Sequence, residues 1–132
     1  MRSKGKINPQ TGKNKTWPES FGHAFDGIRK TAAKERNFRI QIIMGIIAVI
    51  LCIIFRVDTW HFVLVAFAIF FVLSMELMNT ATEALTDLIC QGKPHPLAKT
   101  AKDAAAGAVL LSSAFALVVG AIVATAVVRR YM

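Results

Sequence analysis

The chain has 132 residues, of which 55% are apolar, and its 16 Lys and Arg against eight Asp and Glu give a net charge of +8. A soluble domain of this size mixes its charges with its apolar residues, whereas here long uncharged runs separate charged blocks. The composition therefore excludes an ordinary soluble enzyme and indicates a small integral membrane protein, for which no nucleic-acid partner is expected.

Residues 1–20 combine Lys, Gly, Asn and Pro with few apolar side chains, so we expect a mobile basic tail beside the membrane. The pattern then changes, because apolar residues recur at helical spacing while polar residues occupy the other positions. These apolar residues are Phe21, Ala24, Phe25, Ile28 and Ala32. The pattern predicts an amphipathic helix over residues 21–38 that lies in the membrane interface.

Three segments are apolar enough to cross a bilayer, at about residues 40–55, 59–76 and 104–128. The first two are shorter than the roughly 20 residues that a span needs, so we expect both to extend into their flanks. The second is expected to continue as a cytoplasmic helix to residue 89, and a helix is expected to begin at Pro96. The sequence thus predicts an all-α integral membrane protein with three transmembrane helices and a surface helix, forming one domain over residues 21–132.

The basic residues flank the three spans unequally. Ten of them precede Ile40 and three lie in the loop over residues 90–103, whereas the turn over residues 56–59 holds only Arg56, offset by Asp58. By the positive-inside rule, the N-terminus and the 90–103 loop lie in the cytoplasm. Arg129 and Arg130 go against this orientation but are outnumbered.

Polar side chains follow the second apolar run in the stretch "SMELMNTATEALTDLI", residues 74–89. At 100° per residue they share one helix face, and they are Glu76, Asn79, Thr80, Glu83 and Asp87. One interpretation is that the span simply ends and the helix emerges with a solvated face. However, the span is short, so Glu76 must lie near the hydrocarbon boundary, where an ionisable residue costs about 2–3 kcal/mol and usually serves a function.

Other charged residues are expected at the same rim of the membrane. Lys102 and Asp103 come directly before the third span, and Glu35 approaches from the N-terminal side. Carboxylates can hold Mg²⁺ together with phosphates, a lysine can neutralise a phosphoryl group, and a further carboxylate can take the proton of an attacking hydroxyl. These residues fit phosphoryl transfer to an alcohol, although the sequence has no glycine-rich loop of the standard soluble type.

Small residues recur at every fourth position of the third span, as Ala104, Ala108, Ser112, Ala116, Gly120 and Ala124. Such a ridge permits close contact between helices, although a generally alanine-rich span would show the same pattern. Three spans cannot enclose a nucleotide and a lipid by themselves. We therefore expect a homo-oligomer whose sites are shared between subunits.

Several of these motifs resemble one known family. "MELMNTATEALTDLI" resembles the Glu-x-x-Asn-[Ser/Thr]-Ala-x-Glu signature of the small prokaryotic diacylglycerol kinases, and "AKTAKDAAAGAV" resembles their Ala-Lys-Asp motif. "ERNFRIQ" and "HPLAKTAKDAAAGAV" are more similar to the Gram-positive branch, the undecaprenol kinases. The resemblance runs from about Phe21 to the third span. It implies a homotrimer in the plasma membrane that uses ATP and Mg²⁺ at cytoplasmic sites.

The resemblance also implies a role for each motif residue. Glu76 would be the general base toward the lipid hydroxyl, and Asn79 would orient the groups around it. Glu83 and Glu35 would bind the metal ions that bridge the nucleotide phosphates. The further nucleotide contacts would come from His23, Lys93, Pro94, His95, Lys102 and Asp103, with the loop before Lys102 one residue longer than in the Gram-negative type.

The leading hypothesis is therefore ATP- and Mg²⁺-dependent phosphorylation of undecaprenol, with diacylglycerol as the alternative acceptor. A small proton-coupled transporter is a distant alternative, because an intramembrane glutamate is also typical of a proton relay. That role needs a carboxylate near mid-membrane, whereas Glu76 stands at the end of a span beside other charged residues. A membrane anchor or assembly subunit without chemistry is the third option.

Overall fold

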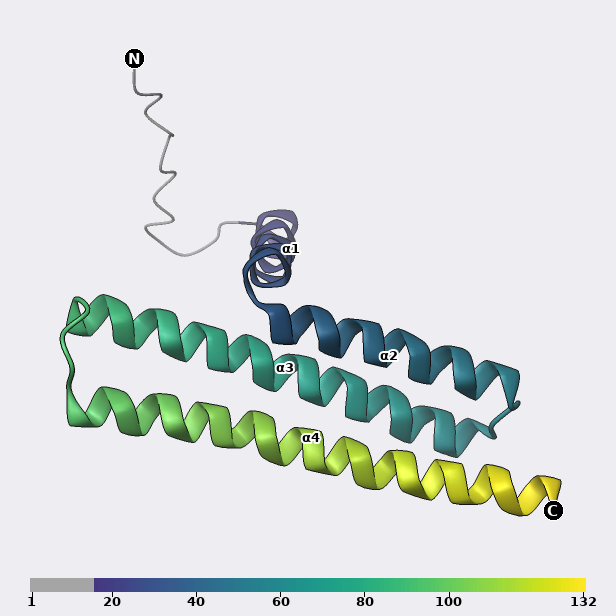
Figure 1. Ribbon diagram of the computed structural model, residues 1–132. Helices are drawn as coiled ribbons and strands as arrows, with labels where there is room; N and C mark the ends of the chain where they lie inside the picture. The colour runs from purple at the N-terminus through teal and green to yellow at the C-terminus, as the bar shows by residue number, and fades with distance from the viewer. Residues whose placement is uncertain (1–15) are drawn as a thin grey trace.

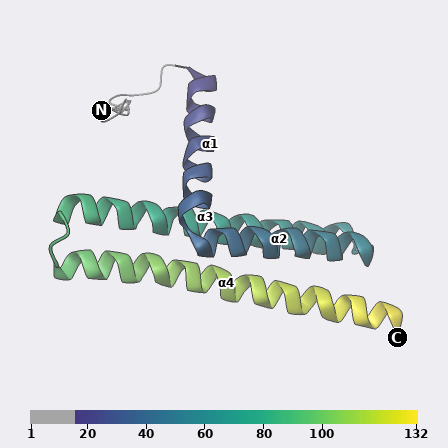
Figure 2. The same ribbon diagram turned by 45° about the horizontal axis from the view of Figure 1, so that its top comes forward.

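The computed structural model describes residues 16–132, and the regular structure in this range is all helical. Four helices follow one another, α1 (Trp17–Lys34), α2 (Arg36–Ile54), α3 (Thr59–Cys90) and α4 (Pro96–Tyr131). α3 lies between α2 and α4 and packs against both, while α1 projects away from this layer (Figures 1 and 2). The all-α architecture is confirmed; most of the expected basic tail, residues 1–15, lies outside the described residues.

Three of the helices, α2, α3 and α4, are long and apolar enough to cross a membrane. Their 19, 32 and 36 residues correspond to lengths of about 28, 48 and 54 Å, against a hydrocarbon core of about 30 Å. The last two helices must therefore extend beyond the core. We call the end of the layer that holds residues 91–95 the loop end. At this end, α3 and α4 both extend beyond the start of α2 (Figure 1). The expected continuation of the second span and the helix start at Pro96 are both observed.

The surface helix begins earlier than the sequence suggested. Thr16 caps α1, because its hydroxyl oxygen accepts a hydrogen bond from the Glu19 N–H at 3.4 Å, and Pro18 occupies the first turn. Residues 17–20 are therefore helical and do not belong to the tail. The apolar periodicity could not place this start, because the cap is polar and precedes the periodic residues.

The surface helix also ends earlier, at Lys34 rather than at residue 38. Glu35 is extended, with φ −93° and ψ 116°, so α1 and α2 are separate helices. Arg39 donates hydrogen bonds to the carbonyl groups of Ala32 and Ala33, both at 3.0 Å. It thereby provides hydrogen-bond donors for carbonyl groups that have no partner within the last turn of α1. The helix that contains the first apolar segment consequently begins at Arg36, four residues before the expected start of that segment.

Among the described residues, few apolar side chains of the three long helices are buried between them. At one contact, Gly45 of α2 faces α3, where a Cβ atom would lie 3.0 Å from the Cγ2 atom of Ile69. Most large apolar side chains face outward, such as Phe70 at 71% exposure. This outward apolar surface is expected for helices surrounded by lipid or by other copies of the chain.

The small-residue ridge of α4 is most deeply buried near its centre. Ser112 is fully buried and Ala116 packs against the core, whereas Gly120 and Ala124 are exposed. Every fourth residue advances by 400° around a helix, so the ridge drifts by 40° at each step. It therefore winds off the α3 contact toward the end of the layer opposite the loop end.

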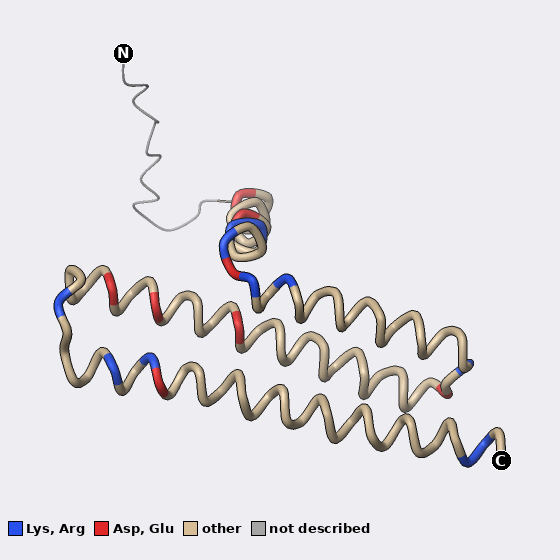
Figure 3. The backbone as a smooth tube through the Cα atoms, in the orientation of Figure 1, with Lys and Arg blue, Asp and Glu red and all other residues tan. Residues whose placement is uncertain are grey.

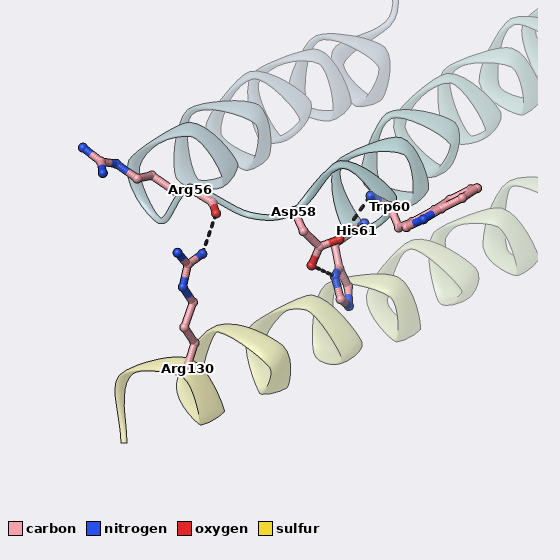
Figure 4. Close-up of polar contacts among 5 residues, drawn as sticks. All are labelled: Arg56, Asp58, Trp60, His61 and Arg130. Carbon is pink, nitrogen blue, oxygen red and sulfur yellow. Dashed lines mark hydrogen bonds and ion pairs between the residues drawn. The ribbon is translucent and has the colours of Figure 1, made fainter.

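That opposite end, which holds the α2–α3 turn, is closed by hydrogen bonds (Figure 4). Asp58 accepts from the N–H groups of Trp60 and His61 at the start of α3, and its carboxylate lies 2.5 Å from His61 Nδ1. These contacts, chiefly the His61 side chain, lower the pKa of Asp58 below its usual value. Arg130 donates to the Arg56 carbonyl at 2.8 Å and ties α4 to this turn.

Candidate active site

Within residues 16–132, Glu76 of α3 is the one charged residue that is buried, with 3% of its surface exposed. The Nε2 atom of Gln41, on α2, donates a hydrogen bond to Glu76 Oε2 at 3.1 Å. A buried carboxylate costs free energy unless it has hydrogen-bond partners, so this amide is an important neighbour. The shared polar face of α3, which we call the polar stripe, comprises Glu76, Asn79, Thr80, Glu83 and Asp87. The burial of Glu76 contradicts the interpretation that this stripe begins as a solvated helix face.

Asn79 and Glu83 continue the same face of α3 toward the loop end. The Nδ2 atom of Asn79 donates to Glu83 Oε1 at 3.1 Å, one helical turn away. Figure 3 shows the acidic residues of α3 spaced along its loop-end half. The helix therefore carries two carboxylates in succession, each held by a side-chain amide.

Two buried oxygen atoms in this region have no hydrogen-bond partner among the described residues. They are Gln41 Oε1 and Asn79 Oδ1, the carbonyl oxygens of the two amides that donate to the carboxylates. The orientation of each amide follows from its partner, because an ionised carboxylate only accepts hydrogen bonds. Buried acceptors without a donor are rare and require an explanation. They indicate that a ligand, an ion or water completes this region.

At the loop end, an open pocket of about 760 Å³ lies between the end of α3, the loop and the start of α4. This volume is within the range of about 300–1,000 Å³ that is usual for small-molecule sites. Five of the predicted nucleotide-binding residues line it, and they are Lys93, Pro94, His95, Lys102 and Asp103. The structure thus brings together most of the residues predicted to contact the nucleotide.

The loop has the backbone geometry needed to connect α3 and α4 in opposite directions. Gln91 and Gly92 have φ values of +50° and +75°, the left-handed conformation that commonly ends a helix. His95 then caps α4, because its Nδ1 atom accepts a hydrogen bond from the Leu97 N–H at 3.2 Å. These two local features place the side chains of residues 93–95 at the pocket.

Charged pairs define the electrostatics of the pocket. Lys102 Nζ lies 2.5 Å from Asp87 Oδ1, and this hydrogen bond raises the pKa of Lys102, which precedes the apolar stretch of α4. Lys99 and Asp103, one turn apart, form a second pair. Lys102 therefore stays protonated at neutral pH, at a position where it can meet an anionic ligand.

Two residues of this region, Asp87 and Gln41, received no functional role in the sequence analysis. Asp87 lay on the polar stripe, which was the available signal, but its partner on another helix could not be read from it. Gln41 had no periodic signal, because it lies among the apolar residues at the start of α2. Both act through contacts between two different helices, with the partner 15 residues away for Asp87 and 35 residues away for Gln41.

The two predicted residues at the N-terminal side stand apart from these contacts. His23 is half-buried on α1, and the Glu35 carboxylate lies 3.6 Å from Lys34 Nζ, with 27% of the Glu35 side chain exposed. Within the described residues, no hydrogen bond joins either of them to Glu76 or Glu83. The single chain therefore does not assemble the whole predicted site.

The donor chemistry suits Mg²⁺, although the residues that the structure describes form no preformed metal cage. Among residues 16–132, no group of three His, Cys, Asp or Glu side chains is placed to hold a metal ion. Mg²⁺ is usually held by only one or two carboxylates together with substrate phosphates. Glu83, next to the unpaired oxygen of Asn79, can supply such a ligand.

Comparison with known proteins gives the family. The model of the prokaryotic diacylglycerol kinases matches residues 22–124. The chain belongs to this family. The match includes every residue of the candidate site and confirms the resemblance carried by the Glu-x-x-Asn and Ala-Lys-Asp motifs.

Three relatives illustrate the breadth of the diacylglycerol kinase family. The chain is 38% identical to a diacylglycerol kinase of Synechocystis, over 76% of this chain and 58% of that protein. It is 38% identical to the undecaprenol kinase of Bacillus subtilis, over 80% of this chain and 85% of that protein. It is 30% identical to the diacylglycerol kinase of Escherichia coli, over 71% of this chain and 76% of that protein. The chain thus spans less than two thirds of the Synechocystis relative, and it is a member of a family of membrane-embedded lipid kinases.

Proposed function

We propose that this chain transfers the γ-phosphoryl group of ATP to the hydroxyl of undecaprenol, at the cytoplasmic rim of the plasma membrane. The observation that supports this most is the buried carboxylate of Glu76 on α3. The end of the same helix lines the loop-end pocket. Asp87 follows Glu76 by 11 positions, which correspond to a rise of about 16 Å along the helix. An extended nucleotide held in the pocket could therefore direct its phosphates along α3 toward Glu76.

In this proposal Glu76 is the general base. Its carboxylate accepts the proton of the lipid hydroxyl while the hydroxyl oxygen bonds to the γ-phosphorus, and the bond from that phosphorus to the bridging oxygen breaks to release ADP. The burial of Glu76 limits the access of water, which would otherwise compete as the acceptor. The Lys102 ammonium group balances the negative charge of the phosphates.

Glu83 and Glu35 are the proposed ligands for Mg²⁺, which when bound with the nucleotide would withdraw charge from the phosphates. The Nδ2 atom of Asn79 donates to Oε1 of Glu83, and Oε2 is the oxygen proposed for the metal. His23, Lys93, Pro94, His95 and Asp103 are the further proposed nucleotide contacts. Three of them follow one another in the loop that lines the pocket.

Undecaprenol is proposed over diacylglycerol on the basis of similarity. The undecaprenol kinase of B. subtilis aligns over 85% of its length, whereas the equally identical Synechocystis diacylglycerol kinase aligns over 58%. The segments "ERNFRIQ" and "HPLAKTAKDAAAGAV" point to the same branch. Diacylglycerol remains the second candidate, because two of the three relatives described above are named for it.

A homotrimer with shared sites is part of the proposal. Among the described residues, no hydrogen bond or ion pair joins Glu35 or His23 to Glu76, and the three long helices expose extensive apolar faces. A neighbouring copy could both cover these faces and complete the site. The excess of basic residues at the loop end and in the N-terminal segment supports a cytoplasmic position for both.

The decisive assay offers the purified protein MgATP with either undecaprenol or diacylglycerol in the same detergent–lipid mixture. Transfer of radiolabelled γ-phosphate to each lipid is measured, with and without Mg²⁺. The proposal predicts Mg²⁺-dependent transfer with preference for undecaprenol. Strong preference for diacylglycerol would overturn the choice of acceptor. No transfer to either lipid would favour a transporter or an anchor.

A further inference from the structure

We propose that Gln41 is a positioning residue for Glu76, and this inference rests on the proposed kinase function. Gln41 precedes Glu76 by 35 residues and lies on a different helix, yet its amide group donates to the Glu76 carboxylate at 3.1 Å. No other hydrogen bond between side chains joins α2 to α3 within the described residues. The contact therefore links the first span directly to the proposed base.

The hydrogen bond gives the two carboxylate oxygens of Glu76 different roles. Gln41 Nε2 holds Oε2, and this leaves Oε1 to accept the proton of the lipid hydroxyl. A general base must lie within hydrogen-bond distance of the proton that it takes, in a fixed orientation. A free carboxylate at the end of a flexible side chain would sample several orientations, so the amide increases the fraction of time in which Glu76 is correctly aimed.

Packing on both sides fixes the position of Gln41 itself. Phe38, one turn earlier, is 2% exposed, and Gly45, one turn later, faces Ile69 of α3. Residues 38, 41 and 45 share one face of α2 because they are three and four positions apart. Gln41 is therefore the polar member of an otherwise apolar contact face.

A purely structural residue at this position would be expected to be apolar as well. The amide instead leaves its Oε1 atom buried without a partner among the described residues, which costs free energy. A neutral amide also differs from a lysine, since it holds the carboxylate without cancelling the negative charge that attracts a proton. Both features fit a residue retained for the alignment of Glu76.

The test compares Gln41→Met and Gln41→Glu with the wild type and with Ile43→Met. Methionine is close to glutamine in size but cannot donate, and glutamate both lacks the donor when ionised and repels Glu76. Ile43 lies two positions away on the opposite face of α2 and is 55% exposed, so it is a matched control for a new methionine in this helix. For each protein, kcat and KM are measured with both substrates, and MgATP binding is measured without lipid.

We expect Gln41→Met to lower kcat for lipid phosphorylation on the order of 100-fold, with MgATP binding changed less than about twofold. Gln41→Glu is expected to lower kcat at least as far, and Ile43→Met to leave it unchanged. An unchanged kcat in Gln41→Met would overturn the inference while the kinase function stands. A parallel loss of kcat and MgATP binding would also overturn it, because a merely structural defect affects both. A wild-type protein inactive toward both lipids would overturn the proposed function and this inference with it.

Discussion

Lys102 of α4 donates a hydrogen bond to Asp87 of α3 across the loop-end pocket, with 2.5 Å between the nitrogen and the oxygen. The two side chains are 38% and 66% exposed, so the pair is solvated and adds little to stability. Its main effect is to orient the lysine beside the space where the nucleotide phosphates are proposed to lie. Asp87 therefore has a position in the site that its place on the polar stripe alone did not reveal.

Replacing Asp87 by Asn tests this orienting effect. We expect KM for MgATP to rise by roughly two- to fivefold with kcat unchanged, because the lysine keeps its charge but loses its preferred direction. Asp58→Asn, at the opposite end of the layer, is the control and should leave KM unchanged. A lower KM in Asp87→Asn would mean instead that Asp87 competes with the phosphates for Lys102.

Removing the proposed metal ligands tests the role of Mg²⁺. Glu83→Gln and Glu35→Gln keep the size of the side chain but remove its charge, so each should raise the Mg²⁺ concentration for half-maximal activity by at least about tenfold. Asp26→Asn, on the exposed surface of α1, is the matched control. The measurement is a Mg²⁺ titration of lipid phosphorylation at saturating ATP. Unaltered titration curves for both Gln variants would remove these residues from the metal site.

A larger side chain at Gly45 tests the packing of α2 against α3. A Cβ atom there would already lie 3.0 Å from Ile69, so Gly45→Leu must separate the helices. We expect a loss of about 1–3 kcal/mol in the free energy of unfolding, measured in detergent. Gly120→Leu should have little effect on the fold of the single chain, because no described atom apart from the adjacent backbone of α4 itself lies within 4 Å of a Cβ placed at Gly120. Equal effects of the two variants would contradict the observed helix contact.

The sequence predicted those features that depend on local patterns. Hydropathy located the three long helices, helical spacing grouped Glu76, Asn79 and Glu83, and Pro96 marked the start of α4. These predictions succeeded because each depends on residues that are close in the chain. The same reasoning explains why residues 93–95 could be assigned to one loop.

Contacts between distant residues could not be predicted in this way. The Gln41–Glu76 hydrogen bond joins residues 35 positions apart, and periodicity within either helix contains no information on which faces meet. The break at Glu35 was missed for a related reason. Arg39 satisfies the last carbonyl groups of α1 from beyond the break, so the local sequence still reads as one continuous helix.

The most direct test of the account is lipid phosphorylation by Glu76→Gln. Glutamine fills the same buried space but cannot accept the hydroxyl proton as a carboxylate does. We predict a loss of kcat of about 10²- to 10⁴-fold with MgATP binding retained. Unchanged turnover in this variant would contradict the assignment of Glu76 as the base, and with it the central claim that the buried carboxylate of α3 activates the lipid.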